Sequence, residues 1–125
     1  MNYDLTPDQL AIKDNFSKFC TKEIEPRAAR LDEASHEEVA GMMKENIKKM
    51  ASIGYLGIGH EEAYGGTNLD LISQAIAGEA VASACASTFL SCGASSGLFG
   101  MPLRLFGTEA QKKKYLPGII QGEMI

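Results

Sequence analysis

The sequence predicts an all-α fold, a helical bundle built around one long, central, buried helix. Helix start signals of the capping-box type recur along the chain. Apolar residues follow a helical period in the segments after them, and later segments lack the period-two alternation of paired strands. One segment, 80–103, carries no charged side chain and is rich in small residues, as the centre of a bundle would be.

The first helix is predicted to begin at Thr6, where Pro7 suits the first turn and Gln9 completes a capping box. Its apolar stripe ends where Pro26 interrupts the helical pattern, and 27–32 is expected to add a short helical turn. The stripe consists of Ile12, Phe16, Phe19, Cys20 and Ile24.

A second capping box, at Ser35 and Glu38, predicts the second helix. Gly54 is expected to end it, because glycine adopts the left-handed conformation without strain. The buried stripe of this helix is predicted to be Val39, Met43, Ile47 and Met50. A glycine-rich, non-helical connection over 54–68 follows, and its Tyr64-Gly65-Gly66 favours a tight turn over a phosphate-binding loop, since the GxGxxG pattern is absent.

The longest helix is predicted from about Leu69 to near Phe99, capped by Asn68 or Thr67. Because its faces are apolar or small, we expect it to be buried all round. Its glycines and serines cost about 0.5–1 kcal/mol each relative to alanine, which tertiary contacts or a ligand must offset. A membrane span is the less favoured interpretation of this serine- and glycine-rich segment.

Two interpretations of the later half of this helix stay open. The first is tight packing between helices. The second is a groove for an extended apolar ligand, on a face that helical spacing assigns to Leu90, Ser91, Ala94 and Leu98.

Thr108 and Gln111 form a third capping box, and Pro117-Gly118 is expected to stop or kink the helix that they open. The three lysines at 112–114 are interpreted as a solvated face. Glu79 is the lone acid of the predicted central helix, and we expect it to have a structural role and not that of a general base.

Composition excludes several classes of protein. The 125 residues suit one domain, and a net charge of −4 argues against non-specific nucleic-acid binding. The three cysteines lack CxxC spacing and are expected to be buried thiols in a reducing compartment. The N-terminus has no leader pattern, which predicts a cytoplasmic protein. His36 and His60 have no partner at metal-ligand spacing, so no metal site is expected; His60 falls in a loop expected to be exposed.

Four segments, in this order, resemble the N-terminal helical domain of the acyl-CoA dehydrogenase family. They are LTPDQ…EIEPRAARLDE, SIGYLGIGHEEAYGGTNLD, EAVASACAST and FGTEAQKKKYLPGIIQGEMI, which together cover essentially the whole chain. The sequence departs from the family pattern at Glu61, where proline is usual, and the departure concerns a local turn.

The resemblance implies an FAD-dependent enzyme that oxidises the Cα–Cβ bond of an acyl-CoA thioester and works as a homo-oligomer with electron-transfer flavoprotein. Residues 1–125 would be its N-terminal helical domain, and the middle β-domain and C-terminal helical domain would be absent from this chain. The catalytic glutamate and the FAD contacts would lie beyond Ile125. The resemblance therefore implies no catalytic or cofactor-binding residue here, and a chain inactive by itself. It does imply substrate-binding residues: Leu90, Ser91, Ala94 and Leu98 match positions that line the acyl chain.

Two alternatives remain open on sequence grounds. One is a flavin oxidase or monooxygenase of the same fold that acts on a substrate without CoA. The other is a non-catalytic helical module that binds a partner or itself through an exposed apolar face.

Overall fold

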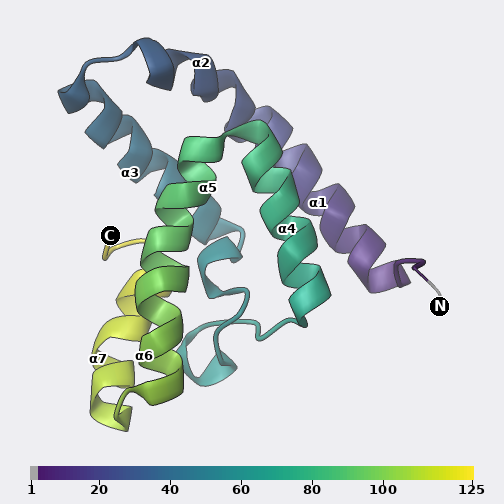
Figure 1. Ribbon diagram of the computed structural model, residues 1–125, viewed down its shortest axis with the longest axis vertical. Coiled ribbons are helices and arrows are strands. Elements are labelled where there is room, and N and C mark those ends of the chain that lie inside the picture. The colour runs from purple at the N-terminus through teal and green to yellow at the C-terminus, as the bar shows by residue number, and fades with distance from the viewer. Residues whose placement is uncertain (1–2) are drawn as a thin grey trace.

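The described part of the chain, residues 3–125 of a computed structural model, consists of helices and turns without a strand (Figure 1). This confirms the predicted all-α class. The elements are α1 (Pro7–Glu23), α2 (Glu25–Glu33), α3 (His36–Ser52), η1 (Tyr55–Gly57), η2 (Glu62–Tyr64), α4 (Leu71–Ala84), α5 (Ala86–Cys92), η3 (Gly93–Gly100), α6 (Met101–Phe106) and α7 (Glu109–Ile120).

Local signals set the starts of three helices. The side chains of Thr6, Ser35 and Thr108 each accept a hydrogen bond from the backbone amide three residues later, and the side chain at that later position accepts a bond from the cap's own amide. All three predicted capping boxes are thus confirmed. Gly54, just past the end of α3, has φ +81°, as its predicted role as a terminator requires.

The predicted single long helix is wrong, because the chain reverses at Cys85. This residue is extended, with φ −162° and ψ 105°, and α4 and α5 therefore run antiparallel on either side of it (Figure 1). The reversal allows α4 to pack against α1 while α5 packs against α3. Neither Gly nor Pro marks this break, so the sequence pattern did not reveal it.

The expected burial of this region on all sides is also wrong. Glu79 on α4 is exposed, and Leu90 and Leu98 keep 66% and 80% of their surface. The helix cap differs as well. The N-cap of α4 is Asp70, instead of Asn68 or Thr67, and its carboxylate accepts hydrogen bonds from the backbone amides of Ile72 and Ser73, each at 3.0 Å.

The helices α5, η3 and α6 follow one another without a break and are together called the rod. Its middle part, η3, is a π-helix. A π-helix bonds i to i+5, so each turn holds more residues than an α-turn. The rod then continues as α6, beside α7 (Figure 1). Pro117 does not stop α7, which runs through it to Ile120.

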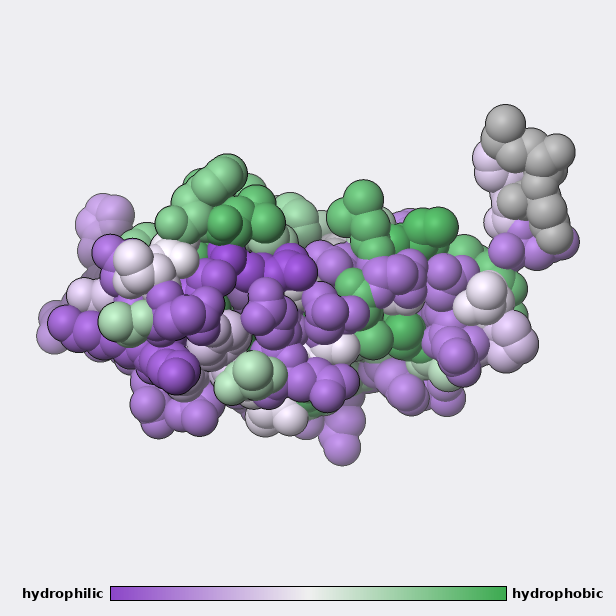
Figure 2. All heavy atoms as spheres, turned by 90° about the horizontal axis from the view of Figure 1, so that it is seen from below, coloured by the Kyte–Doolittle hydropathy of each residue, from purple (hydrophilic) through white to green (hydrophobic). Residues whose placement is uncertain are grey.

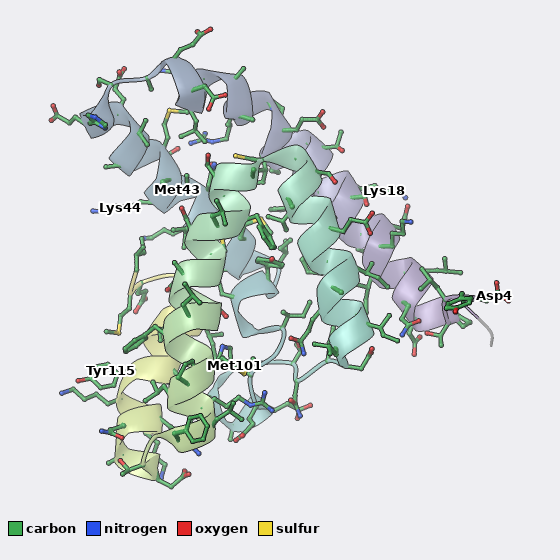
Figure 3. All side chains as sticks on the ribbon, in the orientation of Figure 1. Asp4, Lys18, Met43, Lys44, Met101 and Tyr115 are labelled. Carbon is green, nitrogen blue, oxygen red and sulfur yellow. The ribbon has the colours of Figure 1, made fainter. Side chains whose placement is uncertain are left out.

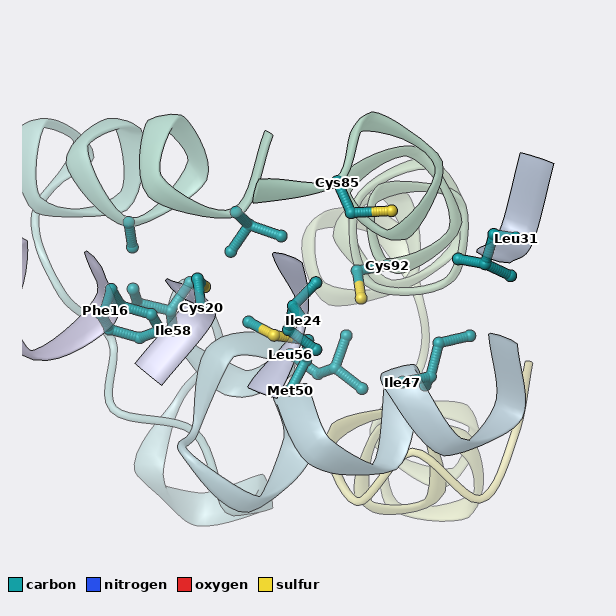
Figure 4. Packing of buried hydrophobic residues seen from close by; sticks show 12 residues of the cluster. Phe16, Cys20, Ile24, Leu31, Ile47, Met50, Leu56, Ile58, Cys85 and Cys92 are labelled. Carbon is teal, nitrogen blue, oxygen red and sulfur yellow. The ribbon is translucent and has the colours of Figure 1, made fainter. Parts of the chain in front are cut away.

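The main core joins α1, α3, η1 and the α4–α5 hairpin (Figure 4). Its fully buried members include Cys20, Ile24, Ile47, Met50 and Leu56. Burial raises the pKa of the Cys20 thiol to about 11 and that of Cys92 to about 12. Cys20, Cys85 and Cys92 are all buried and free, as predicted.

A buried polar chain ties the helices of this core together. Arg27 Nε donates to Asn46 Oδ1 at 2.6 Å, and Asn46 Nδ2 donates to Thr88 Oγ1 at 3.0 Å. The Thr88 hydroxyl in turn donates to Cys85 Sγ at 3.2 Å, so the network ends at the residue where the chain reverses.

A second, smaller cluster lies at the other end of the molecule. Tyr64, Leu116, Ile119 and Ile120 join the η2 turn to α7, and the Tyr64 hydroxyl donates to Glu109 at 2.7 Å. Within residues 3–125, none of the helices combines the length and apolar character that a membrane crossing requires. The same residues contain no cluster of three or more His, Cys, Asp or Glu side chains placed to hold a metal ion.

Candidate functional site

A cavity of about 390 Å³ lies between the α5–η3 rod and the end of the chain. Its size falls in the range of small-molecule sites, which are mainly apolar with a few polar groups. Its lining has that character: Ser91, Ala94, Ser95, Phe99, Ile119, Met124 and Ile125.

The structure brings only two of the four predicted binding residues to this cavity. Ser91 and Ala94 line it, whereas Leu90 and Leu98 are exposed and outside its lining. For Leu98 the π-helix explains the difference, because the residue one turn after Ala94 is now Phe99. Leu90 lies on α5, before the π-helix begins.

Side chains on both sides hold the walls of the cavity in place. Ser95 Oγ donates to the backbone oxygen of Met124 at 3.1 Å, which fixes the end of the chain against η3. The rings of Phe99 and Tyr115 meet edge to face, with centroids 6.2 Å apart. Tyr115 on α7 is labelled in Figure 3. Sequence reasoning missed Ile119 and Met124, because only tertiary contact brings them to η3.

His60 lies on another side of η3, and the expectation that it is exposed is wrong. Only 1% of its surface is accessible, and its Nε2 lies 3.2 Å from Ser96 O and 3.1 Å from Ser96 Oγ. Burial, the largest cause, lowers the pKa of this imidazole below its ordinary value; nearby Arg104 also lowers it, while the bond to Ser96 and the charge of Glu61 act in the opposite direction.

The turn after His60 is tight, as predicted for Tyr64-Gly65-Gly66. Gly65 has φ +97°, and its amide donates to Glu62 O at 3.0 Å. A Cβ on Gly66 would come within 2.0 Å of His60 O, so only glycine fits. The Gly66 amide also has a partner, Glu61 O, so neither glycine amide is available to a phosphate.

The remaining candidates show no catalytic arrangement. Glu79 is exposed on α4, and His36 is exposed in the first turn of α3. Lys113 and Lys114 are exposed as predicted, and Lys112 bonds to Glu109 at 3.3 Å.

Several large apolar side chains on the rod from α5 to α6 are exposed to solvent. In Figure 2 hydrophobic residues gather along the upper edge, above a mainly hydrophilic surface. The exposed apolar residues of the rod from α5 to α6 are Leu90, Leu98, Phe99, Leu105 and Phe106.

Comparison with known proteins relates this geometry to a family. The family model described as "Acyl-CoA dehydrogenase, N-terminal domain" matches residues 6–123. A probable acyl-CoA dehydrogenase of Bacillus subtilis, YngJ, is 38% identical over 98% of the chain and 31% of the relative. A short-chain-specific acyl-CoA dehydrogenase of Clostridium acetobutylicum is 34% identical over the whole chain and 32% of the relative.

Solved structures agree with this relationship. The crystal structure of an acyl-CoA dehydrogenase from Bacillus anthracis, complexed with FAD, superimposes with a TM-score of 0.80 at 32% identity, over 96% of this chain and 20% of that one. The chain thus spans about a third or less of the proteins it matches. Sequence and fold together show that it belongs to the acyl-CoA dehydrogenase family and carries the family's N-terminal helical domain.

Proposed function

We propose that this chain supplies one wall of the acyl pocket in an FAD-dependent acyl-CoA dehydrogenase that oxidises the Cα–Cβ bond of an acyl-CoA thioester. The cavity beside η3 carries the proposal, because it is apolar and lined by Ser91 and Ala94, two of the residues that the family resemblance selects. Leu90 and Leu98 are proposed to meet the substrate or neighbouring parts of the enzyme, since their exposed side chains extend the same apolar surface.

The glycine turn before α4 does not favour an FAD site in the described residues. A dinucleotide needs free backbone amides for its phosphates. The amides of Gly65 and Gly66, in the glycine turn before α4, already donate to Glu62 and Glu61. We therefore assign flavin binding, and with it hydride and proton transfer, to other parts of the enzyme. The role proposed for residues 3–125 is to hold the apolar part of the substrate and keep water from it.

The proposal includes partners of the whole enzyme. Its reduced flavin needs an electron acceptor, and the family resemblance favours electron-transfer flavoprotein. Assembly into a homo-oligomer is supported by the outward apolar residues of the rod, which would be costly to leave in water. A cytoplasmic location is supported by three buried free thiols.

The first experiment concerns the protein made from the complete gene. Purified with FAD, it is expected to be yellow and to be bleached by a saturated acyl-CoA. The 125-residue chain, mixed with FAD and the same acyl-CoAs, is expected to show neither flavin binding nor bleaching. Stoichiometric flavin on the 125-residue chain would contradict the assignment of FAD to other parts of the enzyme.

The second experiment changes the cavity itself. Ala94→Phe in the complete enzyme should lower kcat/KM for the longest accepted acyl-CoA about tenfold relative to the shortest, because a phenyl ring takes up space in the cavity. Ala40→Phe, at an exposed position on α3, is the matched control and should leave the ratio unchanged. An unchanged ratio in Ala94→Phe would show that the acyl chain lies elsewhere.

One observation favours a second candidate, a non-catalytic module that associates through its apolar surface. The exposed Leu90, Leu98 and Phe106 are the large side chains that such a surface would use. Analytical ultracentrifugation of the 125-residue chain tests it, since this function requires oligomers that grow with concentration. A flavin oxidase or monooxygenase would instead show itself by flavin reduction with substrates that lack CoA.

A further inference from the structure

The π-helix η3 is attached to the rest of the molecule on two sides. Toward the cavity, Ser95 bonds to the backbone of Met124. Toward the glycine-rich connection, the next residue, Ser96, bonds to His60 and also donates its hydroxyl to Leu56 O at 2.6 Å. The position of η3, and hence the width of the cavity beside Ala94, depends on both attachments.

The hydrogen bonds at Ser96 define which ring nitrogen of His60 carries the proton. Ser96 O can only accept, and the Ser96 hydroxyl proton is already given to Leu56 O. Nε2 must therefore be the donor to both oxygens. Nδ1 is then an acceptor, and it is buried without a partner within residues 3–125.

The ring has little freedom to move away from this arrangement. A Cβ on Gly100 would lie 3.0 Å from His60 Cε1 and 3.1 Å from Nε2, so η3 presses its backbone against the imidazole. The ring also borders a small cavity of about 150 Å³ that reaches Gln74, Cys92 and Met101. Met101, labelled in Figure 3, lies at the start of α6, where the rod continues from η3. This small cavity borders η3 at Ser96 and Gly97, and it would give that part of η3 room to shift if the Nε2 bonds were lost.

We propose that His60 is a positioning residue that sets substrate chain length: its Nε2–H bonds to Ser96 hold η3 at the distance that defines the cavity beside Ala94. This inference rests on the proposed function, since it names what determines length in that same pocket. His60 itself lines the small cavity and not the larger one, so it acts on the substrate only through η3.

The tautomer is the first test. In long-range ¹H–¹⁵N spectra at pH 8, the His60 ring should show a protonated Nε2 and an unprotonated Nδ1. His36, exposed on α3, is the internal reference. A protonated Nδ1 would overturn the inference, whatever the enzyme's activity, because Nε2 could not then donate to Ser96.

The second test measures chain-length preference in the protein made from the complete gene. His60→Leu removes the donor and should change the ratio of kcat/KM between long and short acyl-CoAs by about fivefold, the factor expected of one net hydrogen bond. His60→Gln keeps an N–H donor and should restore a ratio near that of the wild type. His36→Leu, the matched control, should leave it unchanged.

Ser96→Ala keeps the inference testable if His60→Leu fails to fold. This variant loses the hydroxyl bonds to His60 and Leu56 but keeps the bond between His60 and the Ser96 carbonyl. It should therefore change the ratio of kcat/KM between long and short acyl-CoAs in the same direction as His60→Leu, but by less. An active enzyme whose ratio is the same in wild type, His60→Leu and Ser96→Ala would overturn the inference and leave the proposed function intact. A wild-type protein that oxidises no acyl-CoA would instead overturn the proposed function.

Discussion

The two ends of this molecule are built on different principles. The closed core, formed by Cys20, Ile24, Ile47, Met50 and Leu56, buries its apolar side chains completely. The open end, from α5 through η3 and α6 to α7, leaves large apolar side chains in water and forms a cavity that is open to solvent. The larger buried cluster thus lies in one region, while the region that carries the candidate site combines a smaller buried cluster with exposed apolar side chains. This division is typical of a domain whose binding wall is completed by something that packs against it.

The largest expected effect is in the closed core. Ile47→Ala should lower the free energy of unfolding by about 3 kcal/mol, because it leaves a cavity among fully buried neighbours. Urea unfolding of the variant and the wild type measures the difference. A loss below about 1 kcal/mol would mean that this end is packed no more tightly than the other.

The buried polar chain gives the next largest effect. Asn46→Leu should destabilise by about 2 kcal/mol, since it deprives Thr88 and Arg27 of their buried partner. Asn15→Leu, on the exposed face of α1, is the matched control. Equal stability of the two variants would show that the network does not hold the α4–α5 hairpin against α3.

The buried His60 should make the free energy of unfolding depend on pH. Its folded pKa is lowered, so the unfolded chain binds a proton that the folded chain resists. Its contribution to stability is therefore complete above about pH 6.5 and is lost as pH falls below that value, with a slope of at most about 1.4 kcal/mol per pH unit. Urea unfolding between pH 7 and 5 should show this slope. His60→Gln should flatten it, while the control variant His36→Gln should not.

The smallest effect is expected at the open end. Leu98→Ala should change the free energy of unfolding by less than about 0.5 kcal/mol, because its side chain is 80% exposed. Thermal unfolding of the 125-residue chain measures this. A loss comparable to that of Ile47→Ala would show that Leu98 is covered in solution, as a self-associating module requires.

Local sequence signals predicted much of the fold. The capping boxes at Thr6, Ser35 and Thr108 involve residues only three positions apart, so the bonds form wherever the helix begins. The buried stripes succeeded for a similar reason, since Phe16, Cys20, Ile47 and Met50 repeat at the period of a regular helix.

The lining of the cavity follows from the sequence only in part. Helical spacing and the family resemblance both select Leu90, Ser91, Ala94 and Leu98 as one set; Ser91 and Ala94 line the cavity, Leu98 lies outside it where η3 departs from α-helical spacing, and their role in substrate binding stays a prediction. Ile119 and Met124 come from residues far along the chain, and no periodicity connects them to η3.

The amino-acid sequence by itself determined the helix starts, the glycine turn, the all-α class and the family, because each depends on neighbouring residues or a recurring motif. Tertiary structure alone decided the reversal at Cys85, the burial of His60 and the cavity. Each of these depends on contacts between segments distant in sequence: Thr88, just after the reversal, with Asn46, His60 with Ser96, and η3 with the end of the chain. Such contacts outweigh local helix preference, since a single buried partner contributes as much free energy as several residues of intrinsic propensity.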